Sequence, residues 1–464
     1  MPVHRNLRRV LPAALLLAAA LPAAAQQDSA LAQLQERIDE LDQRVRVLDR
    51  LRELQAESLA TAARTRVGVT AGPGGFSLRS ADGAYQLRLR GYFQTDARVF
   101  FGDDAKVLTN DLLIRRVRPI LEATVAKYYA FRVMPDFAGT ATTLFDAYFE
   151  AQWKPSFGIR AGKFKTPIGL ERLQSATDIK FLERGLPTNL VPTRDVGIQL
   201  QGSLGRGIAE YQAGIFNGAF DLGNNNADVS DRKELVGRLF LTPFARQGPR
   251  APVDLGIGLA VSTTKEEGTS AATGLPGYRE PGQQVVFRYR TSSANPVTGT
   301  VLADGTHSRV APQAYLNKGP LGLIAEYVVS KQAVARDTGV SRTDEHLSHS
   351  AWQVTGGYFL TGEANSFRSI TPKKNFDPLH GGWGALEVVA RYGALTIDKD
   401  AFPRYADSTT SIRKENEWGL GVNWYFTRQV RVAVNYEVTT FKGGAATGDR
   451  PDEKFLGVRF QTAF

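Results

Sequence analysis

The sequence predicts an all-β fold, a sixteen-stranded antiparallel transmembrane β-barrel with an N-terminal α-helical coiled-coil segment. Three observations support this prediction: apolar and polar residues alternate in the last fifty residues, the alternation recurs along the chain, and the chain begins with an export signal. In Glu417–Phe426, for example, one parity is apolar and the other is polar or glycine. Such alternation over about ten residues is typical of a strand between lipid and water. Because one strand of a soluble sandwich can look the same, the prediction depends on the recurrence and the export signal.

Residues 1–25 predict a secretory signal peptide. Arg5, Arg8 and Arg9 precede an apolar run, and the run ends in the small-residue pattern of a cleavage site at Ala23–Ala25. The apolar run is about half of the ~20 residues that a spanning helix needs, which favours a cleaved signal over a membrane anchor.

Composition narrows the class of partner. Removing the three arginines of the signal peptide lowers the formal net charge from +10 to +7, and the chain has no cysteine. A basic excess favours anionic partners, and export argues against nucleic acid. An exported chain without disulfides needs another source of stability, and a closed barrel in which every backbone group is paired would supply it.

Residues 26–59 predict a coiled-coil segment. Apolar residues recur there at alternating steps of three and four, with charged residues between them. The seam consists of Leu31, Leu34, Ile38, Leu41, Val45 and Leu48. An amphipathic helix packed on the protein's own surface is the alternative. Residues 60–84 are a glycine-rich linker that ends in a short hairpin signal, Asp82–Gly83.

Residues 85–464 predict the barrel itself. Sixteen segments alternate, an even number, as single-chain outer-membrane barrels require. Most connections alternate between short turns and longer polar loops such as Lys331–Ser350, but Thr361–Trp383 is long where a short turn is expected. Val285–Arg290 could be an additional strand. The predicted strands are residues 85–101, 114–125, 128–136, 144–153, 157–165, 196–203, 208–216, 233–242, 255–262, 307–317, 321–330, 351–360, 384–392, 417–426, 430–439 and 455–464.

Several short stretches, together and in this order, resemble the phosphate-selective porin O and P family. They are Gly91–Gln94, Ile114–Pro119, Met134–Phe137, Gly162–Pro167 with Glu171–Arg172, Val191–Gly197, Leu360–Glu363, and Asn375–Pro378 leading to Gly381–Glu387. The resemblance covers residues 75–464. It implies a sixteen-stranded barrel in the outer membrane of a Gram-negative bacterium, usually trimeric, that conducts anions. The final Phe464 also resembles the closing aromatic residue that such barrels present to their assembly machinery.

The interval Thr166–Arg194 is the candidate constriction. A sixteen-stranded barrel leaves an aqueous lumen unless something folds into it, and the resemblance places the constricting third outer loop here. The interval carries four bases, Arg172, Lys180, Arg184 and Arg194. It carries three acids, Glu171, Asp178 and Glu183, and a fourth acid, Asp195, follows immediately after it. Such balanced charge also fits a solvated outer loop, so an anion filter requires the bases and acids to segregate.

The wall carries the other candidate anion-pathway residues. Arg88, Arg90, Arg98, Arg116, Arg118 and Arg132 share the parity opposite the apolar face of three adjacent strands. Neighbouring strands lie ~5 Å apart, so these arginines would form one cluster. Guanidinium groups bind phosphate oxygens bidentately, and basic rings exclude cations. Alternatively, the arginines pair with acids across the wall, as in a general porin. Lys163 and Lys165 are also candidates, but they oppose Arg160 in parity, so which of them lines the pore stays open.

The sequence therefore predicts an outer-membrane porin for passive diffusion of anions, with phosphate selectivity, and the alternative is a general porin with weak anion preference. We expect inorganic phosphate or other small anions, outer-membrane lipid and a homotrimer as partners. We expect no enzyme activity, cofactor, metal site or nucleic-acid partner, because no nucleophile–base pair, ordered ligand spacing or phosphate-binding loop occurs. The acidic group around Asp221 and the pair His346 and His349 are assigned to outer loops.

Overall fold

The computed structural model describes residues 11–65, 67–101, 109–227, 231–292, 294–295 and 298–464. The chain divides into two units. One contains the N-terminal helix, and the other comprises Gly68–Arg79 and Gly83–Phe464. The three arginines of the predicted signal peptide lie outside the described residues.

The N-terminal unit is one helix, α1 (Leu11–Thr65). It runs through the segments predicted as signal peptide and coiled coil, whose boundaries stay predictions. The predicted seam is exposed on this single chain, with Leu34 61% and Ile38 60% exposed. An exposed apolar seam is what one strand of a coiled coil presents in the absence of its partners. No described helix is long and apolar enough to cross a membrane.

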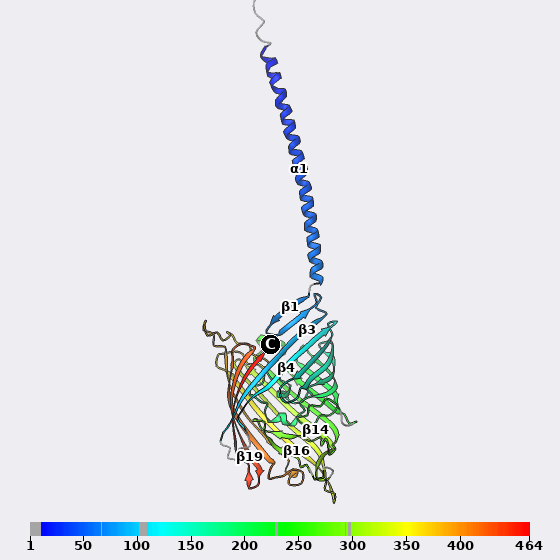
Figure 1. Ribbon diagram of the computed structural model, residues 1–464, viewed down its shortest axis with the longest axis vertical. Helices are drawn as coiled ribbons and strands as arrows, with labels where there is room; N and C mark the ends of the chain where they lie inside the picture. The colour runs from blue at the N-terminus through cyan, green and yellow to red at the C-terminus, as the bar shows by residue number, and fades with distance from the viewer. Residues whose placement is uncertain (1–10, 66, 102–108, 228–230, 293, 296–297) are drawn as a thin grey trace, which may run out of the picture. The chain divides into compact units, whose positions relative to one another are not determined.

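The second unit is a closed antiparallel barrel (Figure 1). Its sixteen described strands confirm the predicted number. They are β3 (Gln86–Phe101), β4 (Asp111–Val125), β5 (Tyr129–Asp136), β6 (Thr143–Lys154), β7 (Phe157–Phe164), β8 (Asp195–Leu204), β9 (Ala209–Phe216), β10 (Glu234–Leu241), β11 (Asp254–Glu267), β14 (Val301–Lys318), β15 (Leu321–Asp337), β16 (Arg342–Phe359), β17 (Ala385–Thr396), β18 (Ile412–Tyr425), β19 (Val430–Ala445) and β21 (Glu453–Ala463).

The last strand closes the barrel on the first. β21 pairs with β3 from Lys454 opposite Phe101 to Ala463 opposite Tyr92. The backbone of Phe464 then exchanges two hydrogen bonds of 3.0 Å with Gly91. Because closure leaves no unpaired edge strand, the backbone polar groups of the wall are satisfied within the sheet.

The remaining elements are short. A hairpin of β1 (Gly68–Gly72) and β2 (Gly75–Arg79) pairs with the start of β3. The possible additional strand is β13 (Val285–Arg288), which pairs with β12 (Gly277–Arg279) in a separate two-stranded sheet. It is therefore part of an outer loop and adds nothing to the wall. The others are β20 (Gly448–Asp449), α2 (Leu170–Leu173), η1 (Leu186–Leu190), η2 (Ala245–Arg250) and η3 (Lys399–Ala401).

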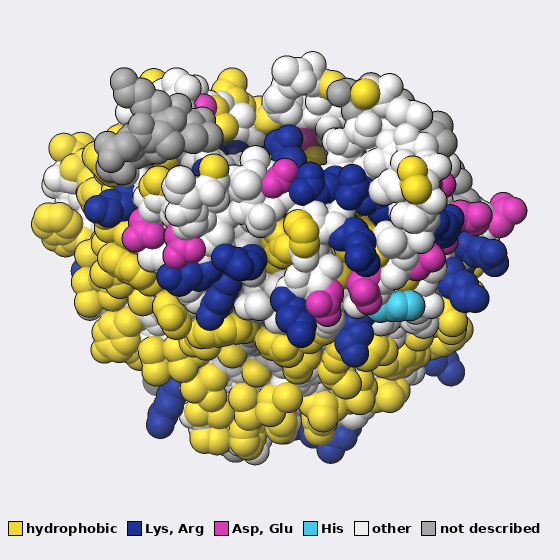
Figure 2. All heavy atoms as spheres, turned by 90° about the horizontal axis from the view of Figure 1, so that it is seen from below, with side chains coloured by type: hydrophobic (Ala, Val, Ile, Leu, Met, Phe, Trp, Pro, Cys, Tyr) yellow, Lys and Arg dark blue, Asp and Glu magenta, His cyan; other side chains and the backbone are white. Residues whose placement is uncertain are grey.

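The two faces of the wall have opposite polarity, as the alternation predicts. On β18, Trp418 and Leu420 are exposed on the outside, whereas Glu417 and Asn423 are buried inside. Figure 2 shows hydrophobic side chains around the outer wall and basic side chains across the end of the barrel that carries the outer loops. The outward side chains therefore form an apolar band around the barrel, as a strand wall between lipid and water requires.

One predicted outer loop is mostly strand. Lys331–Ser350 was expected to be a long polar connection, but β15 continues to Asp337 and β16 begins at Arg342. His346 and His349 consequently lie in β16 and not in a loop. Polar residues beyond the apolar band still pair as strands, because backbone pairing does not require a lipid-facing side.

A charge on the outward face should destabilise the barrel according to its depth. Leu420→Arg lies within the apolar band and should cost about 2–4 kcal/mol, whereas Leu112→Arg, near the outer end of β4, should cost about 0–1 kcal/mol. Urea unfolding of the two variants in lipid vesicles measures the difference. Equal costs would contradict the assignment of the lipid-facing band.

Candidate functional site

The constriction is a loop that folds into the barrel. After β7 ends at Phe164, the chain enters the lumen, passes through α2 and η1, and leaves at β8. Ile168, Ile179, Phe181 and Leu190 have no exposed surface. The interval Thr166–Arg194 is therefore an internal loop, and the alternative of a solvated outer loop is wrong.

Polar side chains of the lumen hold this loop by its backbone. Donors on five strands bind successive loop carbonyls: Gln94 to Ala176 (3.1 Å), Gln461 to Thr177 (3.2 Å), Arg431 to Ile179 (2.9 Å), Asn423 to Lys180 (2.9 Å), Arg459 to Leu182, and Arg391 to Glu183 (2.9 Å). Buried backbone groups must be paired, and an irregular loop cannot pair its own. The polar parity of β3 and β17–β21 provides these partners, so the loop lies against that side of the barrel.

Glu183 is the electrostatic centre of the attachment. Its carboxylate binds Arg115 at 2.6 Å, Arg116 at 3.0 Å, Arg459 at 3.1 Å and Arg98 at 3.3 Å. The surrounding arginines hold the pKa of Glu183 well below its usual range, although burial alone would raise it. The carboxylate therefore stays charged and joins the loop to β3, β4 and β21.

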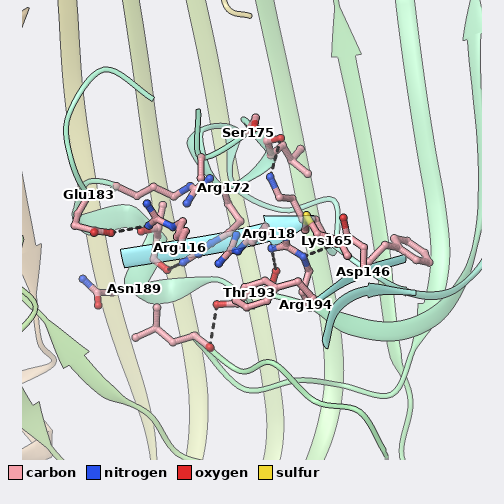
Figure 3. Close-up of a pocket in the computed structure, with 18 of the residues that line it drawn as sticks. Arg116, Arg118, Asp146, Lys165, Arg172, Ser175, Glu183, Asn189, Thr193 and Arg194 are labelled. Atoms are coloured by element: carbon pink, nitrogen blue, oxygen red, sulfur yellow. Dashed lines mark hydrogen bonds and ion pairs between the residues drawn. The ribbon is translucent and has the colours of Figure 1, made fainter. Parts of the chain in front are cut away.

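A cavity of about 640 Å³ lies between the loop and the opposite side of the wall. Figure 3 shows the labelled arginines and Lys165 converging on this space. Its ten basic residues are Arg115, Arg116, Arg118, Arg132, Arg160, Lys165, Arg172, Arg184, Arg194 and Arg279, and its four acidic residues are Asp146, Glu183, Asp221 and Glu280. The cavity is therefore strongly basic.

Much of the arginine wall is nevertheless paired. Arg118 binds Asp136 at 2.7 Å, and Asp146 lies between Arg194 at 2.8 Å and Arg132 at 3.1 Å. Such pairs offset their own charge. The expectation of a paired wall therefore holds for these arginines, whose charge the neighbouring carboxylates already offset.

Three cations in or next to the constriction loop border the cavity and lack this compensation, as does the exposed Arg279 of β12, which donates to the carbonyl of Gln283 at 3.1 Å. Lys165 donates to the carbonyls of Leu173 (3.1 Å) and Gln174 (2.6 Å), Arg172 to that of Thr188 (2.7 Å), and Arg184 to those of Glu171 (3.0 Å) and Gln174 (2.7 Å). Within the described ranges, none of the three pairs with a carboxylate. Removal from bulk water, followed by repulsion from neighbouring arginines, lowers the pKa of Lys165 and of Arg172. A lowered pKa weakens the hold of each group on its proton, so the charge of these two side chains depends on pH more than that of an ordinary lysine or arginine.

Three of the four acids of the loop point away from the 640 Å³ cavity. Glu171 accepts hydrogen bonds from the Gly185 N–H and from Gln353, both at 2.8 Å. Asp195 accepts from the backbone at the start of β8 and in the next outer loop. Asp178 borders a different cavity. Of the four acids only Glu183 borders the 640 Å³ cavity, whereas three of the four bases do. Bases and acids have segregated.

The structure places the predicted anion-pathway residues in four environments. Arg116, Arg118, Arg132, Lys165, Arg172, Arg184 and Arg194 border the 640 Å³ cavity. Arg88, Arg90, Arg132 and Lys180 border a second cavity of about 350 Å³. Arg98 belongs to the cluster around Glu183, and Lys163 borders neither cavity. Lys163 lies opposite Val196 on the outward parity and binds Asn226.

Two basic residues of the cavity, Arg115 and Arg279, were not predicted. Arg160, which the sequence left open, also borders the cavity and pairs with Glu150. A β-bulge between Gln94 and Thr95 shifts the register of β4, which lets both Arg115 and Arg116 reach Glu183. Arg279 comes from β12, in an outer loop that borders the cavity. Alternation in the sequence reveals neither a bulge nor a loop that folds inward.

Removing the charge of Glu183 should destabilise the barrel and loosen the loop. Glu183→Gln leaves three buried guanidinium groups and the partly buried one of Arg115 without their shared anion, and breaking a buried pair on one side costs about 3–5 kcal/mol. Asp344→Asn removes an exposed partner of Arg342 and should cost at most about 1 kcal/mol. Urea unfolding compares the two variants, and equal costs would contradict the proposed role of Glu183.

Comparison with known proteins assigns the fold to a family. No curated protein matches the chain. The outer-membrane channel DcaP of Acinetobacter baumannii is 14% identical, with a TM-score of 0.51, over 84% of this chain and 100% of that chain. In-vitro folded OmpT of Vibrio cholerae is 13% identical, with a TM-score of 0.50, over 82% of this chain and 98% of that chain. These likenesses show the fold.

The family model for phosphate-selective porin O and P matches residues 87–464. The chain therefore belongs to the phosphate-selective porin O and P family, and is a porin of the Gram-negative outer membrane.

Proposed function

We propose that this porin conducts small anions passively, and that Lys165, Arg172 and Arg184 form the site that selects them. The observation that carries the proposal is that these three cations border the cavity beside the constriction loop and donate only to backbone carbonyls. A permeating anion would take the place of the carboxylate partner that these three cations lack. Cations would be repelled from the same place.

Inorganic phosphate is the anion that we propose for this site. Arginine offers a planar fork of donors that matches the oxygens of phosphate, and lysine adds a point charge. The Nε of Arg172 is buried without a hydrogen-bond partner, so a donor remains for an oxyanion. Chloride offers no such directional acceptors. We also propose that the protein is a homotrimer in outer-membrane lipid.

The second candidate is a general porin with weak anion preference. The pairing of Arg118, Arg132 and Arg194 with carboxylates favours it. Single-channel current in a planar bilayer separates the two. Anion-selective chloride current that is blocked by micromolar-to-millimolar phosphate supports a phosphate site, whereas large, weakly selective current that is indifferent to phosphate supports the general porin.

Two lysines of one motif provide a matched pair of variants. Lys165→Ala removes a cation of the proposed site and should weaken phosphate block about ten- to hundredfold, the equivalent of one charge-assisted hydrogen bond. Lys163→Ala removes the same charge outside the cavity and should leave the block unchanged. Titration of phosphate against single-channel current measures both. If both variants weaken phosphate block equally, the block depends on the overall positive charge of the protein and not on a specific site at Lys165.

Anion preference should also depend on pH through Lys165. Because its pKa is lowered, Lys165 releases its proton and loses its charge as the pH rises, below the usual lysine value of about 10.4. The ratio of chloride to potassium permeability should therefore fall with rising pH, at pH values below that at which an ordinary lysine loses its proton. Reversal potentials in a KCl gradient measure this ratio. Lys165→Arg keeps the charge at this position and should weaken the pH dependence, while Arg172, whose pKa is lowered to about 9, retains part of it. A pH dependence as large as that of the unaltered protein would exclude Lys165 as its source.

A further inference from the structure

The connection between β16 and β17 is long where a short turn was expected, and part of it enters the barrel. Glu363, Asn365 and Ile370 are only 4%, 7% and 8% exposed. Ile370 packs with Phe359 and Tyr425 of the adjoining strands. A connection that only joined two strands would have no reason to bury these side chains.

Asn365 uses its whole amide group inside the lumen. Its Nδ2 donates to the carbonyl of Gly357 (3.2 Å), the carbonyl of Pro320 (3.3 Å) and the carboxylate of Glu387 (3.2 Å). Its Oδ1 accepts from Lys180 of the constriction loop at 3.1 Å. Lys180 also forms an ion pair with Glu387. One amide therefore links the wall, the connection and the constriction loop.

Two glycines make room for this group. A Cβ at Gly357 would lie 2.7 Å from Nζ of Lys180, and a Cβ at Gly322 would collide with the Asn365 amide. Both positions lie in wall strands, where glycine is otherwise unfavourable. The wall is therefore shaped to accept Asn365 and Lys180 together.

A second contact joins the same two segments. Gln174 of the constriction loop donates to the carbonyl of Phe367 at 2.8 Å. The Phe367 ring stacks on Tyr315 of β14, with centroids 4.9 Å apart. Further along, Phe376 packs on Trp424, and the Trp424 indole donates to the carbonyl of Trp383 at 2.7 Å. The connection is thus fixed to the wall on both sides of its contacts with the loop.

These two contacts bracket the point where the two cavities meet. Ser175 borders both the 640 Å³ and the 350 Å³ cavity, as do Tyr92 and Arg132. The connection holds Gln174 immediately before Ser175, and Lys180 five residues after it. The stretch between them therefore separates the two compartments of the pore.

We propose that Thr361–Trp383 is a strap that positions the constriction loop, and that Asn365 is its principal positioning residue. Asn365 acts through Lys180 and touches no permeating ion. The strap sets how far the stretch around Ser175 can move, and hence how wide the passage between the two cavities is. The proposal concerns loop position and does not depend on which anion is selected.

The absence of cysteine allows a direct test of loop position. Ser175→Cys introduces a single thiol where the cavities meet. A small methanethiosulfonate reagent, added in chloride on the side of the strap, should modify this thiol about tenfold faster when Asn365→Ala is also present, because the loop has lost the charge-assisted hydrogen bond from Lys180 to Asn365. Open-channel current noise should rise in the same variant. Asn375→Ala, an exposed asparagine of the same strap, is the matched control and should change neither.

A second variant approaches the same contact from the wall. Gly322→Ala crowds the Asn365 amide and should reproduce the faster modification and the noise, while heat-modifiable migration on gels reports an intact barrel. If neither Asn365→Ala nor Gly322→Ala changes the rate of thiol modification or the open-channel current noise, the proposed role of the strap is wrong. If the thiol reacts in no background, the current noise decides alone. Because phosphate is absent throughout, failure here leaves the proposed phosphate site untouched.

Discussion

The attachment of an irregular loop to the inside of the barrel is the constraint on which the pore depends. A loop without regular hydrogen bonding can enter a closed barrel only if the wall satisfies its backbone, and the lumen side chains of β3 and β17–β21 do so. Glu183 adds an ionic contact with four arginines. Since these contacts fix one face of the loop to the wall, its other face and the opposite wall define the pathway.

This attachment also determines the charge of the pathway. The bases and acids of the loop balance in number, and a freely solvated loop would present both. Inside the barrel, Glu171 and Asp195 are used as hydrogen-bond acceptors for buried N–H groups, and Glu183 is used as the ionic contact. Arg172 and Arg184 reach the cavity with only carbonyl partners. The selectivity that we propose would then arise because the fold pairs the acids of the loop and leaves Arg172 and Arg184 with carbonyl partners alone.

The sequence predicted what depends on local pattern. Alternation predicted all sixteen strands, because the two faces of each strand meet different solvents. It could not predict Arg115, which a bulge brings to Glu183, or Arg279, which arrives from a distant loop. The ambiguity between Lys163 and Lys165 has the same origin. Lys163 obeys the outward parity of β7, whereas Lys165 lies beyond the end of the strand, where parity no longer determines direction.

The glycines of the lumen show that wall and loop are matched to each other. Gly419 and Gly457 face Phe181 and Leu182 of the loop, where a Cβ would approach within 2.7 Å and 2.5 Å. Glycine within a strand costs about 0.5–1 kcal/mol relative to alanine, so each such position weakens the bare barrel. The buried loop side chains and their backbone contacts offset that cost only when the loop is in place. Gly322 follows the same rule for the strap, since it accommodates a side chain of Thr361–Trp383. The wall, the loop and the strap therefore stabilise one another as a unit.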